Sequence, residues 1–144
     1  MFRVVLDANV VVSGLLQPKG PSGRILAGVI EGTVRAAVSP AIVDEYRRAL
    51  GYSKIRRRLA ASPDVVSAWV DALTLLAEVV PGDRRVTVVT ADPEDDKYVG
   101  AALEGRATHL VSGDRHLLDI GTYEGIRVLS PREFLHVWER GASI

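Results

Sequence analysis

The sequence contains no cysteine and no long apolar segment, and each absence excludes a class of protein. Without cysteine, neither a disulfide framework nor a thiolate metal site can form. No segment reaches the roughly 18 apolar residues that a membrane-spanning helix needs. The apolar segment that opens the chain is broken by charge as early as Asp7, too early for a signal peptide. We therefore expect a protein of the cytoplasm that does not enter a membrane.

The sequence also lacks an excess of charge of one sign. Its 18 Lys and Arg residues balance 18 Asp and Glu residues, whereas many nucleic-acid-binding domains are strongly basic. The balance counts only weakly against a nuclease. A site that gathers acidic residues lowers the net charge of the protein and regains positive charge locally from bound cations.

What the sequence does contain is an ordinary globular composition in a chain of 144 residues, with 47% hydrophobic and 25% charged residues. A chain of this length buries roughly 70% of its unfolded surface without disulfides or a structural metal. We therefore predict one domain over residues 1–144.

Short apolar segments alternate with helical patterns along the whole chain. Strands are predicted at 3–6, 34–38, 79–80, 86–89, 110–111 and 126–129, and helices at 10–16, 23–30, 39–50, 62–77, 95–104, 114–118 and from 131 onward. Three of the helices begin with Ser-Pro, a capping residue followed by a residue suited to the first helical position. The alternation predicts an α/β fold with a mainly parallel sheet covered on both faces.

Acidic residues follow several of the predicted strands. Asp7 directly follows the first strand, Asp114 lies just past the strand at 110–111, and Asp92, Asp95 and Asp96 follow the segment at 86–89. Glu45 lies about one turn into the helix after the second strand. Ligands of open α/β sheets bind beyond the carboxyl ends of the strands. We therefore expect these carboxylates to lie at one edge of the sheet.

Carboxylates gathered in this way repel one another unless cations lie between them. Oxygen ligands favour Mg²⁺, Mn²⁺ or Ca²⁺. The three histidines, at 109, 116 and 136, show no paired ligand spacing, which argues against zinc. Water bound to such a metal can attack a phosphodiester bond.

Each acidic residue also has an ordinary structural interpretation. Asp7 and Asp114 are suited to cap the helical segments that follow them, and Asp95 and Asp96 are suited to the start of their own helix. Glu45 is spaced to pair with Arg48 three residues later. Only the joint placement of these residues at strand ends favours a metal site.

Three segments resemble the PIN-domain family of nucleases. The first, VVLDANVVVSGLL, opens with a strand and an Asp that is followed two residues later by Asn. The second, SPAIVDEYRRAL, is a helix that carries a Glu. In the third, DDKYVGAALEGRATHLVSGDRHLL, an Asp begins a helix, and a strand then leads to Ser, one further residue and Asp. The resemblance covers nearly the whole chain, and the third segment is the most specific.

This resemblance implies a three-layer α/β/α, Rossmann-like domain with Asp7, Glu45, Asp96 and Asp114 as its catalytic, metal-binding residues. It implies supporting roles for Asn9 and Ser112. Asp96 is assigned by counting back 18 positions from Asp114, with Asp95 and Asp92 as neighbouring competitors. The small prokaryotic members of the family imply a Mg²⁺- or Mn²⁺-dependent endoribonuclease, the toxin of a toxin–antitoxin pair, with an antitoxin partner and a homodimeric state.

Basic residues suggest where an RNA substrate would bind. Arg115 adjoins Asp114, and Arg56 and Arg57 belong to the densest basic run of the chain. Arginine side chains supply the sequence-independent contacts to phosphates. The same run is equally suited to a solvated helix face.

Two other functions remain open from the sequence. A phosphatase with an Asp nucleophile usually carries a second acid two residues later, where this chain has Asn9. A catalytically silent binding module with the same fold would not use the acidic residues at all.

Overall fold

The computed structural model describes residues 1–142 and contains a six-stranded sheet in the order β3-β2-β1-β4-β6-β5. The strands are β1 (Arg3–Leu6), β2 (Arg35–Val38), β3 (Glu78–Val79), β4 (His109–Val111), β5 (Thr122–Tyr123) and β6 (Ile126–Leu129). Neighbouring strands pair in parallel except β5, which runs antiparallel to β6. The prediction of an α/β fold with a mainly parallel sheet is confirmed.

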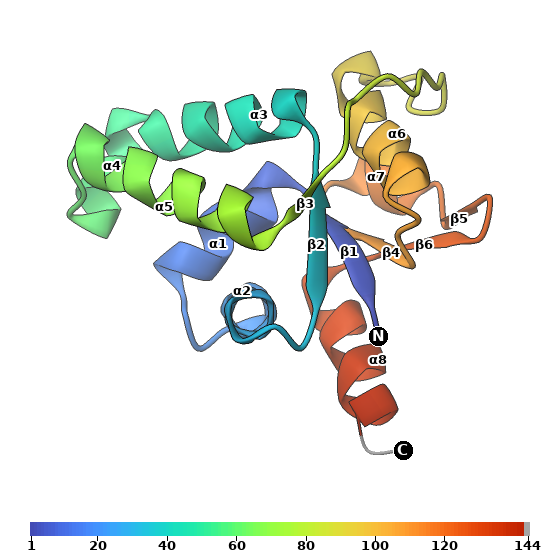
Figure 1. Ribbon diagram of the computed structural model, residues 1–144, viewed down its shortest axis with the longest axis horizontal. Coiled ribbons are helices and arrows are strands. Elements are labelled where there is room, and N and C mark those ends of the chain that lie inside the picture. The colour runs from blue at the N-terminus through green and yellow to red at the C-terminus, as the bar shows by residue number, and fades with distance from the viewer. Residues whose placement is uncertain (143–144) are drawn as a thin grey trace.

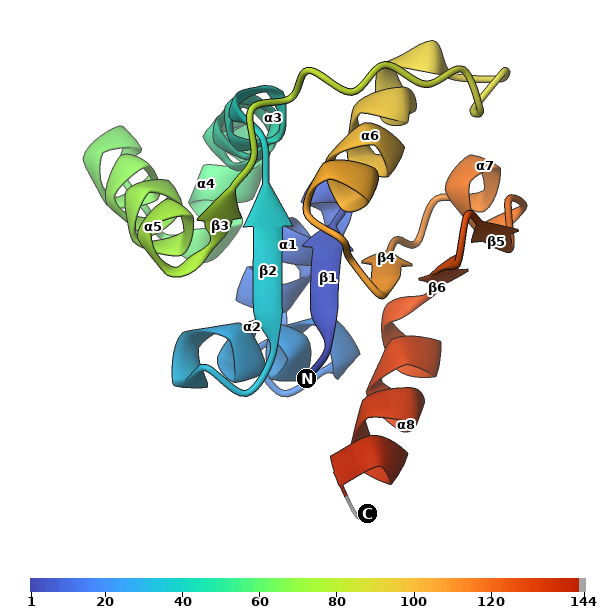
Figure 2. The ribbon, with the colours of Figure 1, turned by 45° about the vertical axis from the view of Figure 1, so that its right-hand side comes forward.

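Helices cover both faces of this sheet, as Figures 1 and 2 show. They are α1 (Ala8–Leu16), α2 (Pro21–Glu31), α3 (Pro40–Gly51), α4 (Ser53–Leu59), α5 (Pro63–Leu76), α6 (Asp96–Glu104), α7 (Arg115–Leu118) and α8 (Pro131–Ala142), with a 3-10 turn, η1, at Pro93–Asp95. Helix α6 packs on β1, β2 and β4, and α1 and α2 lie on the opposite side of the sheet. The expected three-layer sandwich is confirmed; the last two residues of the domain predicted at 1–144 lie outside the described residues.

The Ser-Pro segments begin helices in the way that the sequence predicts. The hydroxyls of Ser39 and Ser62 accept hydrogen bonds from backbone N–H groups three residues later, in the first turns of α3 and α5. Before α8, Ser130 and Glu133 form a reciprocal pair, in which each side chain accepts from the backbone N–H of the other. Helix α2 instead begins at Pro21, two residues before the start predicted at residue 23, because Pro21 takes the first helical position.

The predicted strand at 86–89 is wrong. Residues 81–92, which we call the 81–92 loop, cross from β3 to the start of α6 without joining the sheet (Figure 2). The backbone N–H groups of Val88 and Val89 donate to the Asp96 carboxylate instead, at 3.0 and 2.7 Å. Two N–H groups that a strand would use for pairing are therefore satisfied by the helix that follows.

The core forms around β1, which pairs with β2 on one side and β4 on the other, and its Val4, Val5 and Leu6 are almost completely buried. The central position of β1 fixes the place of the residue that follows it. Among residues 1–142, no single helix is long and apolar enough to cross a membrane; α4 and α5 meet the length and composition requirement only as a pair bent by 85°.

Candidate active site

Asp7 lies between the end of β1 and the start of α1. Its backbone N–H continues the sheet by donating to the Val111 carbonyl, and its side chain caps α1 by accepting from Asn9 N–H at 3.3 Å. The side chain is only 5% exposed. The capping interpretation of Asp7 is therefore correct, and it fixes a buried carboxylate at the carboxyl edge of the sheet.

Ser112 joins the first and last acidic residues of the predicted set. Its fully buried hydroxyl donates to Asp7 Oδ2 at 2.6 Å and accepts from Asp114 N–H at 2.9 Å. Asp114 in turn caps α7 by accepting from His116 N–H. Two residues 105 positions apart in the chain, Asp7 and Ser112, are thus in direct contact because β1 and β4 are neighbours.

The third acidic residue to face this pair is Asp95. Its side chain shares a hydrogen bond with Asp114 and is repelled by Asp92, Asp114 and Asp7. The Asp95 Oδ2 atom is buried and has no hydrogen-bond partner among the described residues. An unpaired, buried carboxylate oxygen of this kind calls for a donor or a cation.

The hydrogen bonds described for the carboxylate of Asp96, the residue assigned by counting, are with the 81–92 loop. Its carboxylate accepts from Val88 and Val89 N–H and thereby holds the 81–92 loop. The structure therefore brings Asp95, rather than the expected Asp96, to Asp7 and Asp114.

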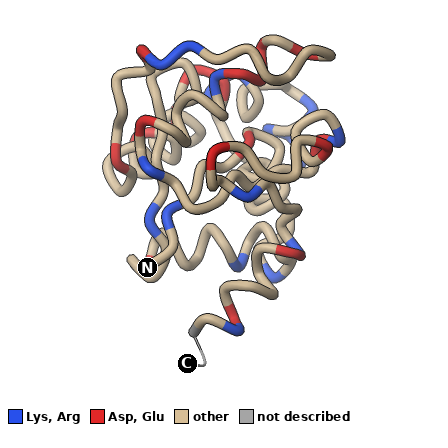
Figure 3. Tube along the Cα trace, turned by 90° about the vertical axis from the view of Figure 1, so that its right-hand side faces the viewer, with Lys and Arg blue, Asp and Glu red and all other residues tan. Residues whose placement is uncertain are grey.

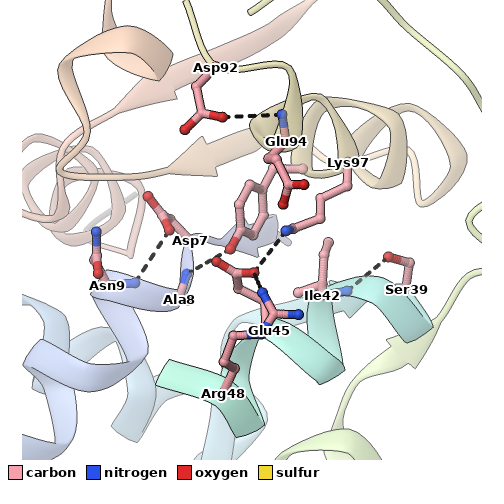
Figure 4. Close-up of polar contacts among 11 residues, drawn as sticks. Asp7, Ala8, Asn9, Ser39, Ile42, Glu45, Arg48, Asp92, Glu94 and Lys97 are labelled. Carbon is pink, nitrogen blue, oxygen red and sulfur yellow. Dashed lines mark hydrogen bonds and ion pairs between the residues drawn. The ribbon is translucent and has the colours of Figure 1, made fainter. Parts of the chain in front are cut away.

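Glu45 reaches the same region from α3, as Figure 4 shows. Its Oε2 atom is 2.9 Å from Lys97 Nζ and 3.0 Å from Arg48 Nη1. The pair with Arg48 confirms the structural interpretation of Glu45, while its charge also repels that of Asp7. The contact with Lys97 has no signal in the sequence, because 52 residues separate the two.

Burial and repulsion change the acidity of these carboxyl groups. Burial is the main cause that raises the pKa of Asp7; hydrogen bonds from Ser112 and Asn9 oppose it, and the charges of Asp114 and Glu45 add to it. Burial first, and then the contact with Asp114 and the neighbouring acidic charges, raise the pKa of Asp95 to about 7.

Two buried tyrosines line the ends of the segment that carries Asp7. The Tyr46 hydroxyl donates to the Leu6 carbonyl, and the Tyr98 hydroxyl accepts from Ala8 N–H. Burial, followed by the charge of Asp7, raises the pKa of both hydroxyls. Both tyrosines therefore remain neutral and fix the backbone on either side of Asp7.

The donor chemistry of the cluster fits a hydrated divalent cation. The donors are oxygens only, the charges of Asp92, Asp114 and Asp7 oppose ionisation of Asp95, and Asp95 Oδ2 is unpaired among the described residues. Within residues 1–142, no three acidic or histidine side chains converge closely enough to hold a metal directly. Mg²⁺ keeps several of its waters and needs only one or two carboxylates, so water-bridged binding is compatible with this arrangement.

The three arginines predicted to contact substrate lie in different places. Arg115 is exposed at the start of α7, next to Asp114. Arg56 and Arg57 lie in the last turn of α4, where Arg56 also donates to the Gly51 carbonyl. Figure 3 shows acidic and basic residues interspersed along the backbone in that view. The substrate roles of these arginines stay predictions.

Comparison with known proteins identifies one family. The family model described as "PIN domain" matches residues 3–116, which include all the acidic residues above. Uncharacterized protein MJ1680 of Methanocaldococcus jannaschii is 27% identical over 147 residues, and the match covers 96% of this chain and 93% of that protein. Because the relative is uncharacterized, the match points to no particular reaction.

Proposed function

The chain belongs to the PIN-domain family, a nuclease-type fold, and from this premise we propose that it is a metal-dependent endoribonuclease. Asp7, Asp95, Asp114 and Glu45 are the proposed metal-binding residues, with Mg²⁺ or Mn²⁺ as the ion. Asp96 supports the site by holding the 81–92 loop, in place of the metal-binding role that its spacing suggests. Asn9 and Ser112 keep their supporting roles.

One observation carries this proposal. Asp95, Asp114, Ser112 and Asp7 form a continuous chain of contacts at the carboxyl edge of the sheet, and the acidic charges of Asp114 and Glu45 repel Asp7 while those of Asp92, Asp114 and Asp7 repel Asp95. Such an arrangement is costly for the folded protein unless a cation completes it. A protein that used these residues only to cap helices would have no reason to bring them together.

The proposed reaction is hydrolysis of a phosphodiester bond, in which water adds to phosphorus and a P–O bond breaks. A bound divalent ion supplies positive charge for the phosphate oxygens and lowers the pKa of a water. The protein residues provide fixed geometry. Ser112 orients Asp7 and Asp114, the two tyrosines immobilise the backbone around Asp7, and Lys97 and Arg48 hold Glu45 in place.

We also propose the biological setting that the small prokaryotic PIN proteins suggest: a cytoplasmic toxin that forms a homodimer and is silenced by an antitoxin. This part rests on the family resemblance alone. Growth arrest on induced expression, relieved by a co-expressed antitoxin and absent for Asp7→Asn, is the expected result.

The enzyme proposal is tested by cleavage of a mixed RNA pool with Mn²⁺ or Mg²⁺. We expect metal-stimulated cleavage by the wild-type protein and its loss in Asp7→Asn, whose fold is checked by circular dichroism. Equal cleavage by a rigorously purified Asp7→Asn protein would refute the assignment. Metal-independent folding with no metal binding at millimolar concentration would instead favour a silent binding module.

A further inference from the structure

A pocket of about 440 Å³ lies beside the acidic cluster, between the 81–92 loop, the start of α3 and helix α6. Its charged lining includes Arg84 and Arg85 from the loop, Arg48 and Asp44 from α3, and Lys97 from α6. Lys97 also contacts Glu45 at 2.9 Å, so the pocket and the proposed active site share a wall. Its volume is in the range that small-molecule sites occupy.

The loop wall of this pocket is fixed at both ends. At one end, the Arg84 N–H donates to Glu104, and the Arg84 carbonyl lies so close to α6 that a Cβ on Gly100 would be 2.5 Å from it. At the other end, Asp96 accepts from Val88 and Val89 N–H. The backbone at Arg84 is therefore held in place while its side chain remains exposed.

The lining contains equal numbers of acidic and basic side chains, but several of them already have partners within the protein. Asp96 and Glu104 accept from backbone N–H groups of the loop, and Arg48 and Lys97 pair with Glu45. The ion pairs found among residues 1–142 include neither Arg84 nor Arg85. These two arginines are the cations left to meet an anionic ligand, while Asp44 and Glu94 remain as exposed acceptors.

We propose that this pocket binds one nucleotide of single-stranded RNA, with the phosphate at Arg84 and Arg85. The proposal rests on the proposed function and adds a substrate position to it. A simple anion would not require acidic groups in the lining, whereas a nucleotide presents both an anionic phosphate and hydrogen-bond donors on the ribose and base. Since Lys97 links the pocket to Glu45, the adjacent phosphodiester would lie toward the acidic cluster.

Binding is measured separately from cleavage. The probe is a fluorescently labelled single-stranded RNA of about ten nucleotides, titrated with protein in EDTA and followed by anisotropy. The test variant is Arg84→Ala/Arg85→Ala. The matched control, Arg106→Ala/Arg127→Ala, removes the same charge from exposed positions at the opposite end of the sheet, beside the amino ends of β4 and β6.

We expect the test variant to bind at least tenfold more weakly and to lose about 0.7 from the slope of log K against log salt, because the contact with one phosphate is removed. The control variant is expected to bind within about twofold of wild type. If Arg84→Ala/Arg85→Ala unfolds by circular dichroism, the single variants Arg84→Gln and Arg85→Gln take its place.

Equal weakening by both double variants would overturn the pocket in favour of general electrostatic attraction, and so would unchanged binding by the test variant or no RNA binding by wild type. Cleavage by wild type in Mn²⁺ reports on the enzyme proposal independently. If wild type cleaves RNA and the test variant binds RNA as tightly as wild type, only the pocket is rejected. If the test variant selectively loses binding and wild type shows no cleavage, the pocket is supported and the enzyme proposal is rejected.

Discussion

Asp95 and Asp96 are adjacent in sequence but have different partners. The first faces Asp114 and Asp7, and the second accepts from the 81–92 loop. Successive residues at the start of a helix point about 100° apart, so a shift of one position changes which side of the helix a carboxylate meets. Counting back from Asp114 leads to the start of α6, but the count does not say which of the two adjacent carboxylates faces the edge of the sheet.

This difference predicts opposite results for two conservative substitutions. Asp95→Asn removes the carboxylate on which the charges of Asp114 and Asp7 act and is expected to lower metal-stimulated RNA cleavage by about 100-fold or more. Asp96→Asn retains an oxygen that accepts from Val88 and Val89, so its cleavage is expected to stay within a few-fold of wild type. Initial rates at saturating Mn²⁺ compare the two; the reverse order would return the metal-binding role to Asp96.

The raised pKa of Asp95 predicts how the stability of the metal-free protein depends on pH. Well below pH 3.8 the carboxyl is protonated in both the folded and the unfolded state. As the pH rises toward 7, the unfolded state releases its proton first, so the free energy of unfolding falls. The Asp95→Asn variant does not lose free energy of unfolding in this way as the pH rises. After allowance for solvent screening, we expect it to be more stable than wild type at pH 8 by about 1 kcal/mol.

Thermal melts in EDTA at pH 4, 6 and 8 measure this effect, which corresponds to about 3 °C at pH 8. Burial lowers the pKa of His109, so protonation of the unfolded state below pH 6.5 also reduces stability at acid pH. Both proteins contain His109, and the difference between their melting temperatures therefore isolates Asp95. A difference that is the same at all three pH values would contradict the assignment.

At the scale of elements, capping residues and short apolar segments were sufficient to predict most of the sheet and helices. The capping serines before Pro40 and Pro63 mark helix starts because they act on their own first turn. The segment at 86–89 has the composition of a strand, yet a strand also needs a neighbour. Here the acceptor nearest to its N–H groups is Asp96, a tertiary contact that composition does not contain.

The attachment of the 81–92 loop is expected to depend on one side-chain oxygen. Asp96→Ala leaves the N–H groups of Val88 and Val89 without their acceptor and is expected to destabilise the protein by about 2 kcal/mol. Hydrogen exchange should show faster exchange at these two amides. Asp96→Asn serves as the control because it keeps an acceptor; equal exchange in the two variants would show that the loop is held by its other contacts.

At the scale of the whole molecule, the order of the strands assembles the site. The rule that ligands bind at the carboxyl ends of parallel strands predicted that Asp7 and Asp114 would share an edge, and their common contact with Ser112 agrees. The sequence does not reveal that Tyr98 and Lys97, from the helix that crosses β1, complete the surroundings of Asp7 and Glu45. These contacts arise from packing between α6 and the sheet, which no local pattern encodes.

Since acidic repulsion opposes folding of the whole domain, a bound cation is expected to stabilise it. Binding to the folded state alone at one hundred times the dissociation constant adds about 2.7 kcal/mol, or about 8 °C in the melting temperature. Asp7→Asn is expected to melt at or above the wild-type temperature in EDTA, because one repelling charge is removed, and to gain nothing from Mn²⁺. Melts with Mn²⁺ or with NaCl of equal ionic strength separate site binding from screening. An equal gain in melting temperature for wild type and Asp7→Asn would show that the ion binds elsewhere. General screening would not explain such a gain, because the formal net charge of zero leaves little overall repulsion for a cation to relieve.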